Sequence, residues 1–135
     1  MKLNYFALAG ILVLLAGCSA FPTADPLAGT SWELYAYQKN RPIEGSTLTI
    51  SFEDGQIHGS AGCNSYGGSY EVNGGKITVS EIFATLMACP EPEGLMEQET
   101  MFLQFLGNAQ RYEIVDGQLR IFGSDHEALT FVTAK

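Results

Sequence analysis

Cys18 is the residue whose surroundings point most clearly to chemistry. It directly follows a run from Tyr5 to Gly17 that carries no charge, and Lys2 places a positive charge ahead of that run. At about 1.5 Å per helical residue the run is roughly 20 Å long, which is too short to cross a hydrocarbon core of about 30 Å. A short apolar run behind a basic residue, ending in small residues, is typical of a secretory signal. The sequence therefore directs attention first to the thiol of Cys18.

The four residues Leu15-Ala16-Gly17-Cys18 resemble a bacterial lipobox. That resemblance implies thioether lipidation of Cys18, cleavage before it and acylation of the new amino group, and two or more acyl chains anchor a protein stably. Ser19 stands where an Asp usually means inner-membrane retention, so it favours the outer membrane. We therefore expect a lipoprotein of the cell envelope, anchored in the outer membrane and facing the periplasm. A soluble export signal with an incidental cysteine and an uncleaved signal anchor are the alternatives.

The chain divides into three segments on this interpretation. Residues 1–17 are a lipoprotein signal peptide, residues 18–28 are the lipidated cysteine with a flexible tether, and residues 29–133 are the folded domain. Removal of the signal peptide takes away one basic residue, so the formal net charge of −8 becomes one unit more negative. An acidic chain repels nucleic acid and anionic headgroups, so we expect the lipid alone to make the membrane contact.

Two cysteines, Cys63 and Cys89, remain once Cys18 carries lipid. In an oxidising compartment an even number of cysteines favours a disulfide between them, and two buried thiols are the alternative. Neither residue belongs to a Cys-x-x-Cys pair, and neither has a histidine at ligand spacing, so we expect no metal site.

Residues for catalysis are sparse, because His58 and His126 are the only histidines in the sequence. We expect His58 on the surface or rim of a strand and His126 in a solvated turn, since a lone histidine beside carboxylates is seldom a general base. Glu97 and Glu99 cannot face each other at i and i+2 on a helix. No nucleophile elbow, zinc-protease motif or phosphate-binding loop is present in the sequence. We therefore expect no catalytic residue, no cofactor and no enzymatic activity.

About eight short segments alternate apolar and polar residues with the period of a β-strand. They lie at residues 32–36, 48–52, 56–61, 66–72, 76–79, 112–114, 119–121 and 129–131. Asp54-Gly55, Asn73-Gly74-Gly75 and Asp116-Gly117 separate three pairs of them and are hairpin signals, since two-residue turns need positive φ. Leu95 to Leu106 has helical spacing instead. We expect a mainly β (α+β) domain in which about eight antiparallel strands form a partly open barrel with one covering helix.

A second signature is the segment from Gly62 to Tyr70, Gly-Cys-Asn-Ser-Tyr-Gly-Gly-Ser-Tyr, which stands in a fixed order with several unrelated motifs. These are Gly29-Thr30-Ser31-Trp32-Glu33-Leu34, Ile50-Ser51-Phe52, Thr85-Leu86-Met87-Ala88-Cys89, Met96-Glu97-Gln98-Glu99, Leu119-Arg120-Ile121 and Leu129-Thr130-Phe131. The ordered set resembles the META domain family over roughly residues 27 to 133. The resemblance implies a small β-rich barrel with one helix. It supplies no active site, so its matching positions form a structural signature: Trp32, Gly62, Asn64, Tyr66, Gly68, Tyr70, Thr85 and Met87.

The function expected from these features is non-enzymatic. The resemblance implies a role in envelope maintenance or stress response, which we expect to work by docking a protein partner. The alternative is a carrier or sensor of a small hydrophobic ligand in the barrel, with Met87, Met96, Met101 and the aromatic residues lining a cavity instead of forming the core. A hydrolase or an inhibitor is a third possibility. The sequence does not specify the partner, the ligand or the oligomeric state.

Overall fold

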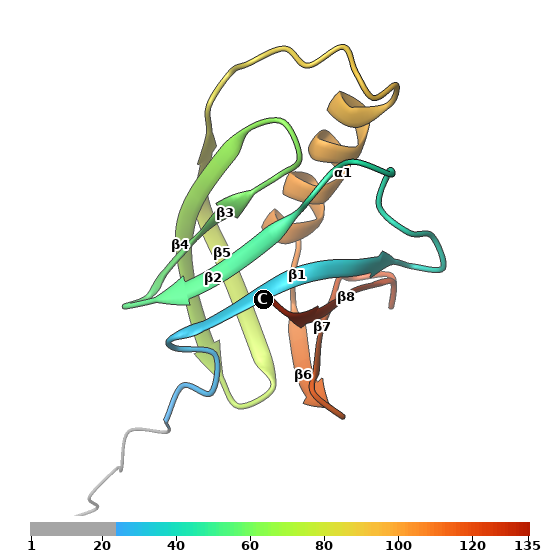
Figure 1. Cartoon of the computed structure of the whole chain (residues 1–135). Helices are drawn as coiled ribbons and strands as arrows, with labels where there is room; N and C mark the ends of the chain where they lie inside the picture. Colours follow the sequence, from blue (N-terminus) through green and yellow to red (C-terminus); the bar gives the residue numbers. More distant parts are fainter. Residues whose placement is uncertain (1–23) are drawn as a thin grey trace, which may run out of the picture.

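The computed structural model describes residues 24–135, and that part of the chain folds into eight strands and one helix. The strands are β1 (Thr30–Tyr37), β2 (Thr49–Glu53), β3 (Gln56–Ser60), β4 (Ser65–Asn73), β5 (Lys76–Ala84), β6 (Arg111–Val115), β7 (Gln118–Phe122) and β8 (Ala128–Thr133). The helix, α1 (Leu95–Gly107), lies between β5 and β6 in the chain. Every strand is antiparallel to its neighbours in the sheet, and β8 pairs with β1 (Figure 1). The predicted mainly β fold with one helix is confirmed.

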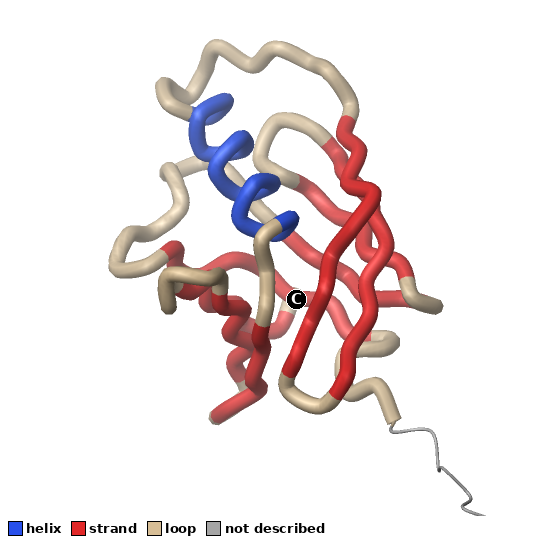
Figure 2. The backbone as a smooth tube through the Cα atoms, turned by 180° about the vertical axis from the view of Figure 1, so that it is seen from behind, coloured by secondary structure: helices blue, strands red, loops and turns tan. Residues whose placement is uncertain are grey.

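The barrel is closed, where the sequence predicts a partly open one. Its sparsest seam lies between β5 and β6, which share a single residue pair, Lys76 with Arg111. Two backbone hydrogen bonds flank this pair, from the Ile77 N–H to the Gln110 carbonyl and from the Tyr112 N–H to the Gly75 carbonyl. Beyond the pair, α1 packs against β5 (Figure 2). One short ladder therefore completes the sheet, and the helix covers the mouth next to it.

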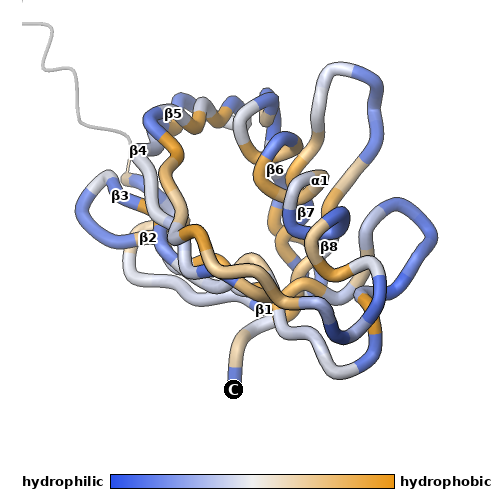
Figure 3. The backbone as a smooth tube through the Cα atoms, turned by 90° about the horizontal axis from the view of Figure 1, so that it is seen from above, coloured by the Kyte–Doolittle hydropathy of each residue, from blue (hydrophilic) through white to orange (hydrophobic). Residues whose placement is uncertain are grey.

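Buried apolar side chains of the strands and the helix form one core cluster. The strands enclose this core as a ring (Figure 3). In β2, Ile50 and Phe52 point inward and are buried, while the residues between and beside them are not. This period of two puts one face of each strand into the core. Aromatic rings meet edge to face there, with centroids 4.9 Å apart for Phe52 and Tyr70 and 5.6 Å apart for Tyr66 and Phe102. Burial of this face is the main stabilising contribution to the barrel.

The predicted hairpin turns follow from residues that tolerate left-handed backbone. Asp54 and Gly55 have φ of 48° and 77° between β2 and β3, and Asp116 and Gly117 have φ of 52° and 72° between β6 and β7. Two consecutive positive φ values match the right-handed twist of the flanking strands. These turns set the register in which the inward faces of neighbouring strands coincide.

Helix α1 starts at Leu95, as predicted, and ends at Gly107, one residue beyond the predicted end. Its buried face consists of Leu95, Glu99, Phe102 and Leu106, which are spaced by three or four residues. Gly94 precedes the helix with φ of 84°, a conformation that costs a glycine little. The helix thus places a carboxylate among three large apolar side chains at the end of the barrel.

The described chain contacts the barrel from Asp25 onward. Leu27 is fully buried, and its N–H donates to the Asp25 carboxylate at 2.9 Å. The same carboxylate accepts the hydroxyl of Tyr70. Residue 24 lies at the end of the barrel opposite the loop between β5 and α1 (Figure 1). Cys18 and the expected signal peptide lie outside the described residues. Within 24–135 no helix has the length and apolar character needed to span a bilayer.

Candidate functional site

Asn64 joins the turn between β3 and β4 to the loop between β5 and α1. Its side-chain oxygen accepts hydrogen bonds from the Thr85 hydroxyl at 2.8 Å and from the Met87 N–H at 2.7 Å. Its side-chain nitrogen donates to the Met87 carbonyl at 3.1 Å and to the Glu99 carboxylate at 2.6 Å. The amide thus uses both donors and both acceptor positions, which is what a buried amide needs.

Glu99 completes this network from the helix, with only 6% of its surface exposed. One carboxylate oxygen accepts the N–H groups of Asn64 at 2.7 Å and Cys63 at 3.2 Å, and the other accepts the Asn64 side chain. Several N–H donors around a carboxylate offset much of the cost of taking it out of water. We call Asn64, Thr85, Met87 and Glu99 the polar clamp, because together they fix the turn, the loop and α1 to one another.

The sequence pattern places Glu99 beside Glu97 and in the motif Met96-Glu97-Gln98-Glu99, and neither observation predicts that its carboxylate is buried. A signal was nevertheless present, since Glu99 occupies the same helical face as Leu95, Phe102 and Leu106. A glutamate at a core position of an amphipathic helix is seldom buried without a partner. Its partners are backbone and amide groups on a distant turn, which the periodicity of a single helix cannot reveal.

A disulfide between Cys63 and Cys89 reinforces the polar clamp, with the two Cα atoms 5.9 Å apart. The predicted disulfide is therefore confirmed. Thr85, Met87 and Cys89 are alternate residues of one loop, and each is attached to the turn that holds Cys63 and Asn64. The loop is extended and outside the barrel sheet, yet it is tied down at three points.

The attached loop presents apolar side chains to solvent. Leu86 is 99% exposed, Met87 is 57% exposed, and Phe83 at the end of β5 is 68% exposed. We call these three residues the apolar loop surface. The Phe83 ring lies directly over Gly67, where a Cβ would come within 2.6 Å of it. Every charged residue between positions 80 and 100 is a glutamate. Large apolar side chains that are exposed and held in place make this part of the surface a candidate contact site.

Two glycines of the structural signature are required by close approaches around the polar clamp. Gly62 has φ of 112°, and a Cβ there would lie 2.9 Å from Cδ1 of Leu95. At Gly68 a Cβ would lie 2.9 Å from the Ser80 carbonyl oxygen, at the point where the β4–β5 register shifts. A side chain at either position would push the helix or β5 away from β4.

The aromatic members of the structural signature serve the core. The Trp32 indole donates to the Thr30 hydroxyl at 2.7 Å, and the Tyr66 hydroxyl donates to the Thr49 carbonyl at 2.8 Å. Burial raises the pKa of Tyr66 well above its usual value. The pKa of Tyr70 is raised by burial first, and then by its hydrogen bond to Asp25 and the charge of that carboxylate.

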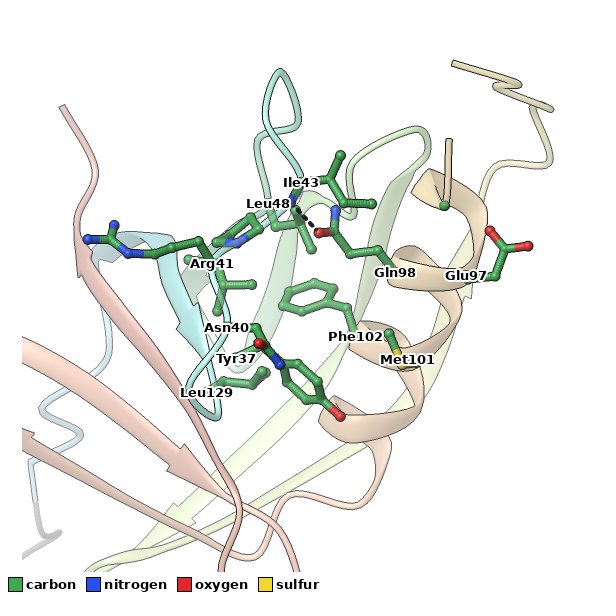
Figure 4. A pocket seen from close by; sticks show the side chains of 13 residues that line it. Tyr37, Asn40, Arg41, Ile43, Leu48, Glu97, Gln98, Met101, Phe102 and Leu129 are labelled. Atoms are coloured by element: carbon green, nitrogen blue, oxygen red, sulfur yellow. Dashed lines mark hydrogen bonds between the residues drawn. The ribbon is translucent and has the colours of Figure 1, made fainter. Parts of the chain in front are cut away.

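An apolar pocket of about 210 Å³ lies between α1 and the loop that follows β1 (Figure 4). Leu48, Phe102 and Leu129 line its inner wall, and Met101 lies on the helix side. The Gln98 side chain closes one rim, since it accepts the Ile43 N–H at 2.8 Å and donates to the Ser46 hydroxyl at 3.0 Å. Further lining residues are Arg41 and Glu97, whose charged ends point away from the cavity (Figure 4).

The two histidines lie on separate elements. His58 is exposed on β3, opposite Ser51 and Gly67 of the neighbouring strands. His126 is exposed in the turn between β7 and β8, with φ of 64°. Among residues 24–135 no group of three or more histidine, cysteine or acidic side chains is arranged to hold a metal ion.

The sequence pattern of the META domain matches residues 25–135. A protein from Burkholderia xenovorans, solved by NMR, is 25% identical with a TM-score of 0.69, over 91% of this chain and 99% of that chain. A second NMR structure is 23% identical with a TM-score of 0.65, over 79% of this chain and 91% of the other. A DUF4847 family protein from Bacteroides vulgatus is 15% identical with a TM-score of 0.62, over 82% of this chain and 96% of that one. No curated protein matches the chain.

The chain belongs to the META domain family. The more distant solved structures share the barrel fold. Family membership and fold do not by themselves assign an activity, which has to be argued from the surface of this chain.

Proposed function

We propose that this META domain is a non-enzymatic lipoprotein of the cell envelope that docks a protein partner through the apolar loop surface. The observation that carries this proposal is the combination of exposure and attachment at residues 85–89. An exposed leucine on a loose loop would lose conformational entropy on binding, whereas a leucine on a loop held by the polar clamp and a disulfide loses less. The docking surface is thus preorganised.

The position of the loop supports a partner away from the membrane. The described chain begins at one end of the barrel, and the loop lies at the other (Figure 1). If Cys18 carries the lipid, the anchor is attached through the end that holds Asp25 and Tyr70. The apolar loop surface then faces the periplasm, where a protein can reach it.

The charge around the loop defines the chemistry of the partner. Glu81, Glu91 and Glu93 are exposed and close in the chain to the apolar loop surface, and that stretch of chain contains no lysine or arginine. Apolar anchors surrounded by acids favour an apolar patch rimmed by lysine or arginine. An anionic lipid surface is disfavoured by the same charges.

Replacement of the lipidated residue tests the anchor. In the Cys18→Ser variant no thioether can form, so the domain is released from membranes or accumulates unprocessed. Fractionation of envelopes with an antibody to the folded domain measures this. A variant that stays with washed outer membranes as firmly as the wild type contradicts the anchoring proposal.

Crosslinking from a single position tests the docking. A photoreactive amino acid in place of Leu86 should capture one protein partner in intact cells, and the adduct should weaken when Glu91 and Glu93 are changed to lysine. The matched control is Ile114, another exposed apolar residue, which lies on β6 away from the loop. Equal adducts from positions 86 and 114, or adducts unaffected by the charge reversal, contradict the proposed docking surface.

A second candidate function is the binding of a small hydrophobic ligand, and the pocket beside α1 favours it. Its inner wall is apolar, and the polar groups of Gln98 are already hydrogen-bonded, so it suits a short neutral apolar group. The rest of the barrel interior is occupied by core side chains, which limits the ligand to the mouth. Native mass spectrometry of the chain from residue 19 onward tests this, and it should detect a bound apolar molecule that the Phe102→Trp variant excludes. A spectrum of bare protein at every extraction condition removes this candidate.

A further inference from the structure

We propose that a hollow on the outer face of the β5–β6 seam binds a phosphate group. The hollow has a volume of about 450 Å³. Lys76, Arg111 and His126 line it, together with the hydroxyl-bearing residues Thr78 and Ser124. We call these five residues the basic hollow. It is separate from the apolar loop surface and from the pocket beside α1.

Electrostatic repulsion makes the Lys76–Arg111 pair unfavourable. These residues stand directly opposite each other on neighbouring strands. The backbone hydrogen bonds are made by Ile77 with Gln110 and by Tyr112 with Gly75, so Lys76 and Arg111 form a non-hydrogen-bonded pair, whose side chains lie closest together. Like charges in this arrangement destabilise a sheet. An anion between the two side chains would turn that repulsion into attraction.

Positive charge is scarce in the rest of the sequence. The sequence has 7 lysine and arginine residues against 15 acids. Two of these few cations converge on the single ladder pair that closes the barrel. On a protein whose average field repels anions, a local concentration of positive charge in a concave site is the arrangement that attracts one.

The side chain of Arg111 is held in place by Phe122 and Glu113. Its guanidinium carbon lies 3.9 Å from the centroid of the Phe122 ring, and its Nη1 lies 3.7 Å from Oε2 of Glu113. Nη1 of Arg120 also lies 3.5 Å from Oε1 of Glu113, so the two arginines and the one glutamate together keep a net positive charge. Asp125 and Glu127 flank His126 in the chain but line a neighbouring hollow beside Phe105. A stacked guanidinium keeps its planar fork of donors available for an oxyanion.

The donor set favours phosphate over a single carboxylate. Lys76 and Arg111 match a doubly charged group, and the hydroxyls of Thr78 and Ser124 add neutral donors on the walls. A phosphate offers three or more acceptor oxygens for such a set, whereas a carboxylate offers two. A free phosphate compound and a phospholipid headgroup carry the same chemistry.

The thermal midpoint of the full chain in neutral detergent tests the proposal, with inorganic phosphate as the probe and sodium chloride at equal ionic strength as the reference. Phosphate should raise the midpoint in a saturable way, and Lys76→Gln should weaken the apparent affinity at least tenfold. Lys39→Gln removes the same charge outside the basic hollow and should respond as the wild type does. A second series replaces part of the detergent with phosphatidylglycerol.

The outcomes separate the two sources of phosphate. Stabilisation by inorganic phosphate that Lys76→Gln removes supports a site for a free phosphate compound. Stabilisation only by phosphatidylglycerol, again removed by Lys76→Gln, supports a headgroup site. No saturable effect in either series, or the same effect in Lys76→Gln and Lys39→Gln, overturns the proposal.

Discussion

At the scale of single residues, the fold depends on a polar group that an apolar core seldom accepts. Glu99 is buried, and its carboxylate is stabilised by N–H donors from Cys63 and Asn64. A network of this kind stabilises a structure when every member has a partner, and it becomes a liability when one is removed. Asn64 and Glu99 are therefore as important to this end of the barrel as the leucines around them.

Removal of the Glu99 carboxylate should destabilise the domain strongly. Glu99→Ala leaves the N–H groups of Cys63 and Asn64 without their acceptor, and we expect the free energy of unfolding to fall by about 3 kcal/mol. Glu97→Ala, on the exposed side of the same helix, should change it by less than about 0.5 kcal/mol. Urea unfolding of both variants measures the difference. Equal effects at positions 97 and 99 would show that the polar clamp contributes nothing.

The buried tyrosines predict a loss of stability at alkaline pH. Burial raises the pKa of Tyr66 and Tyr112, and burial with Asp25 raises that of Tyr70. Above about pH 10 the unfolded chain loses these protons while the folded chain keeps them, so unfolding becomes easier as the pH rises. The stabilisation is complete below about pH 10 and is lost above it.

The Tyr66→Phe variant isolates one of these contributions. It should lose about 1 kcal/mol at neutral pH with the hydrogen bond to Thr49, and its stability should fall less steeply above about pH 10. Urea unfolding across the range from about pH 8 to pH 11 gives both slopes. A variant whose slope equals that of the wild type contradicts the burial argument for Tyr66.

At the scale of elements, local pattern predicts most of the barrel and long-range contacts explain the rest. The hairpins at Asp54-Gly55 and Asp116-Gly117 follow from turn chemistry alone. The predicted strand at 76–79 is too short, because β5 continues to Ala84. Glu81 has φ of 53° and interrupts the alternation, and the β4–β5 register shifts near Gly68, so the period of two is lost where the strand goes on.

The attached loop was only partly predictable for a similar reason. An even number of cysteines in an oxidising compartment favours the Cys63–Cys89 bond, and the structure contains this bond. The role of Asn64 as the residue that holds Met87 depends on a turn and a loop that are distant in the chain. Sequence reasoning identifies Asn64, Thr85 and Met87 as parts of a signature, and only the three-dimensional arrangement shows that they bond to one another.

Loss of the disulfide should weaken the whole domain and loosen the loop. In the Cys63→Ala, Cys89→Ala double variant the constraint on the unfolded chain disappears, which costs about 3.5 kcal/mol for this loop length. The bonds from Asn64 remain, so amide hydrogen exchange should increase most in the residues between Met87 and α1. Exchange that is unchanged there would mean that the polar clamp alone holds the loop. If the proposed lipid anchor on Cys18 holds the protein in the envelope, its localisation should not change, because Cys18 is intact.

At the scale of the whole molecule, the two ends of the barrel differ in what they offer. The described chain begins at the end near Asp25, and the loop between β5 and α1 lies at the opposite end (Figure 1). That loop and the end of β5 carry the exposed side chains of the apolar loop surface. The loop is rigidly attached and its apolar side chains point outward, and we propose that a protein partner contacts it there. The basic hollow on the β5–β6 seam adds a second and chemically opposite surface.

Methionine oxidation in intact cells tests the proposed docking through the apolar loop surface most directly, because the domain carries its own control. Met87 and Met101 are 57% and 46% exposed, and only Met87 belongs to the apolar loop surface. Brief exposure to peroxide converts accessible methionines to sulfoxides, which mass spectrometry counts. If a protein partner covers the apolar loop surface, Met87 should oxidise several-fold more slowly in intact cells than in the purified protein, while Met101 should oxidise equally in both. Equal rates for Met87 in the two settings would contradict the proposed docking.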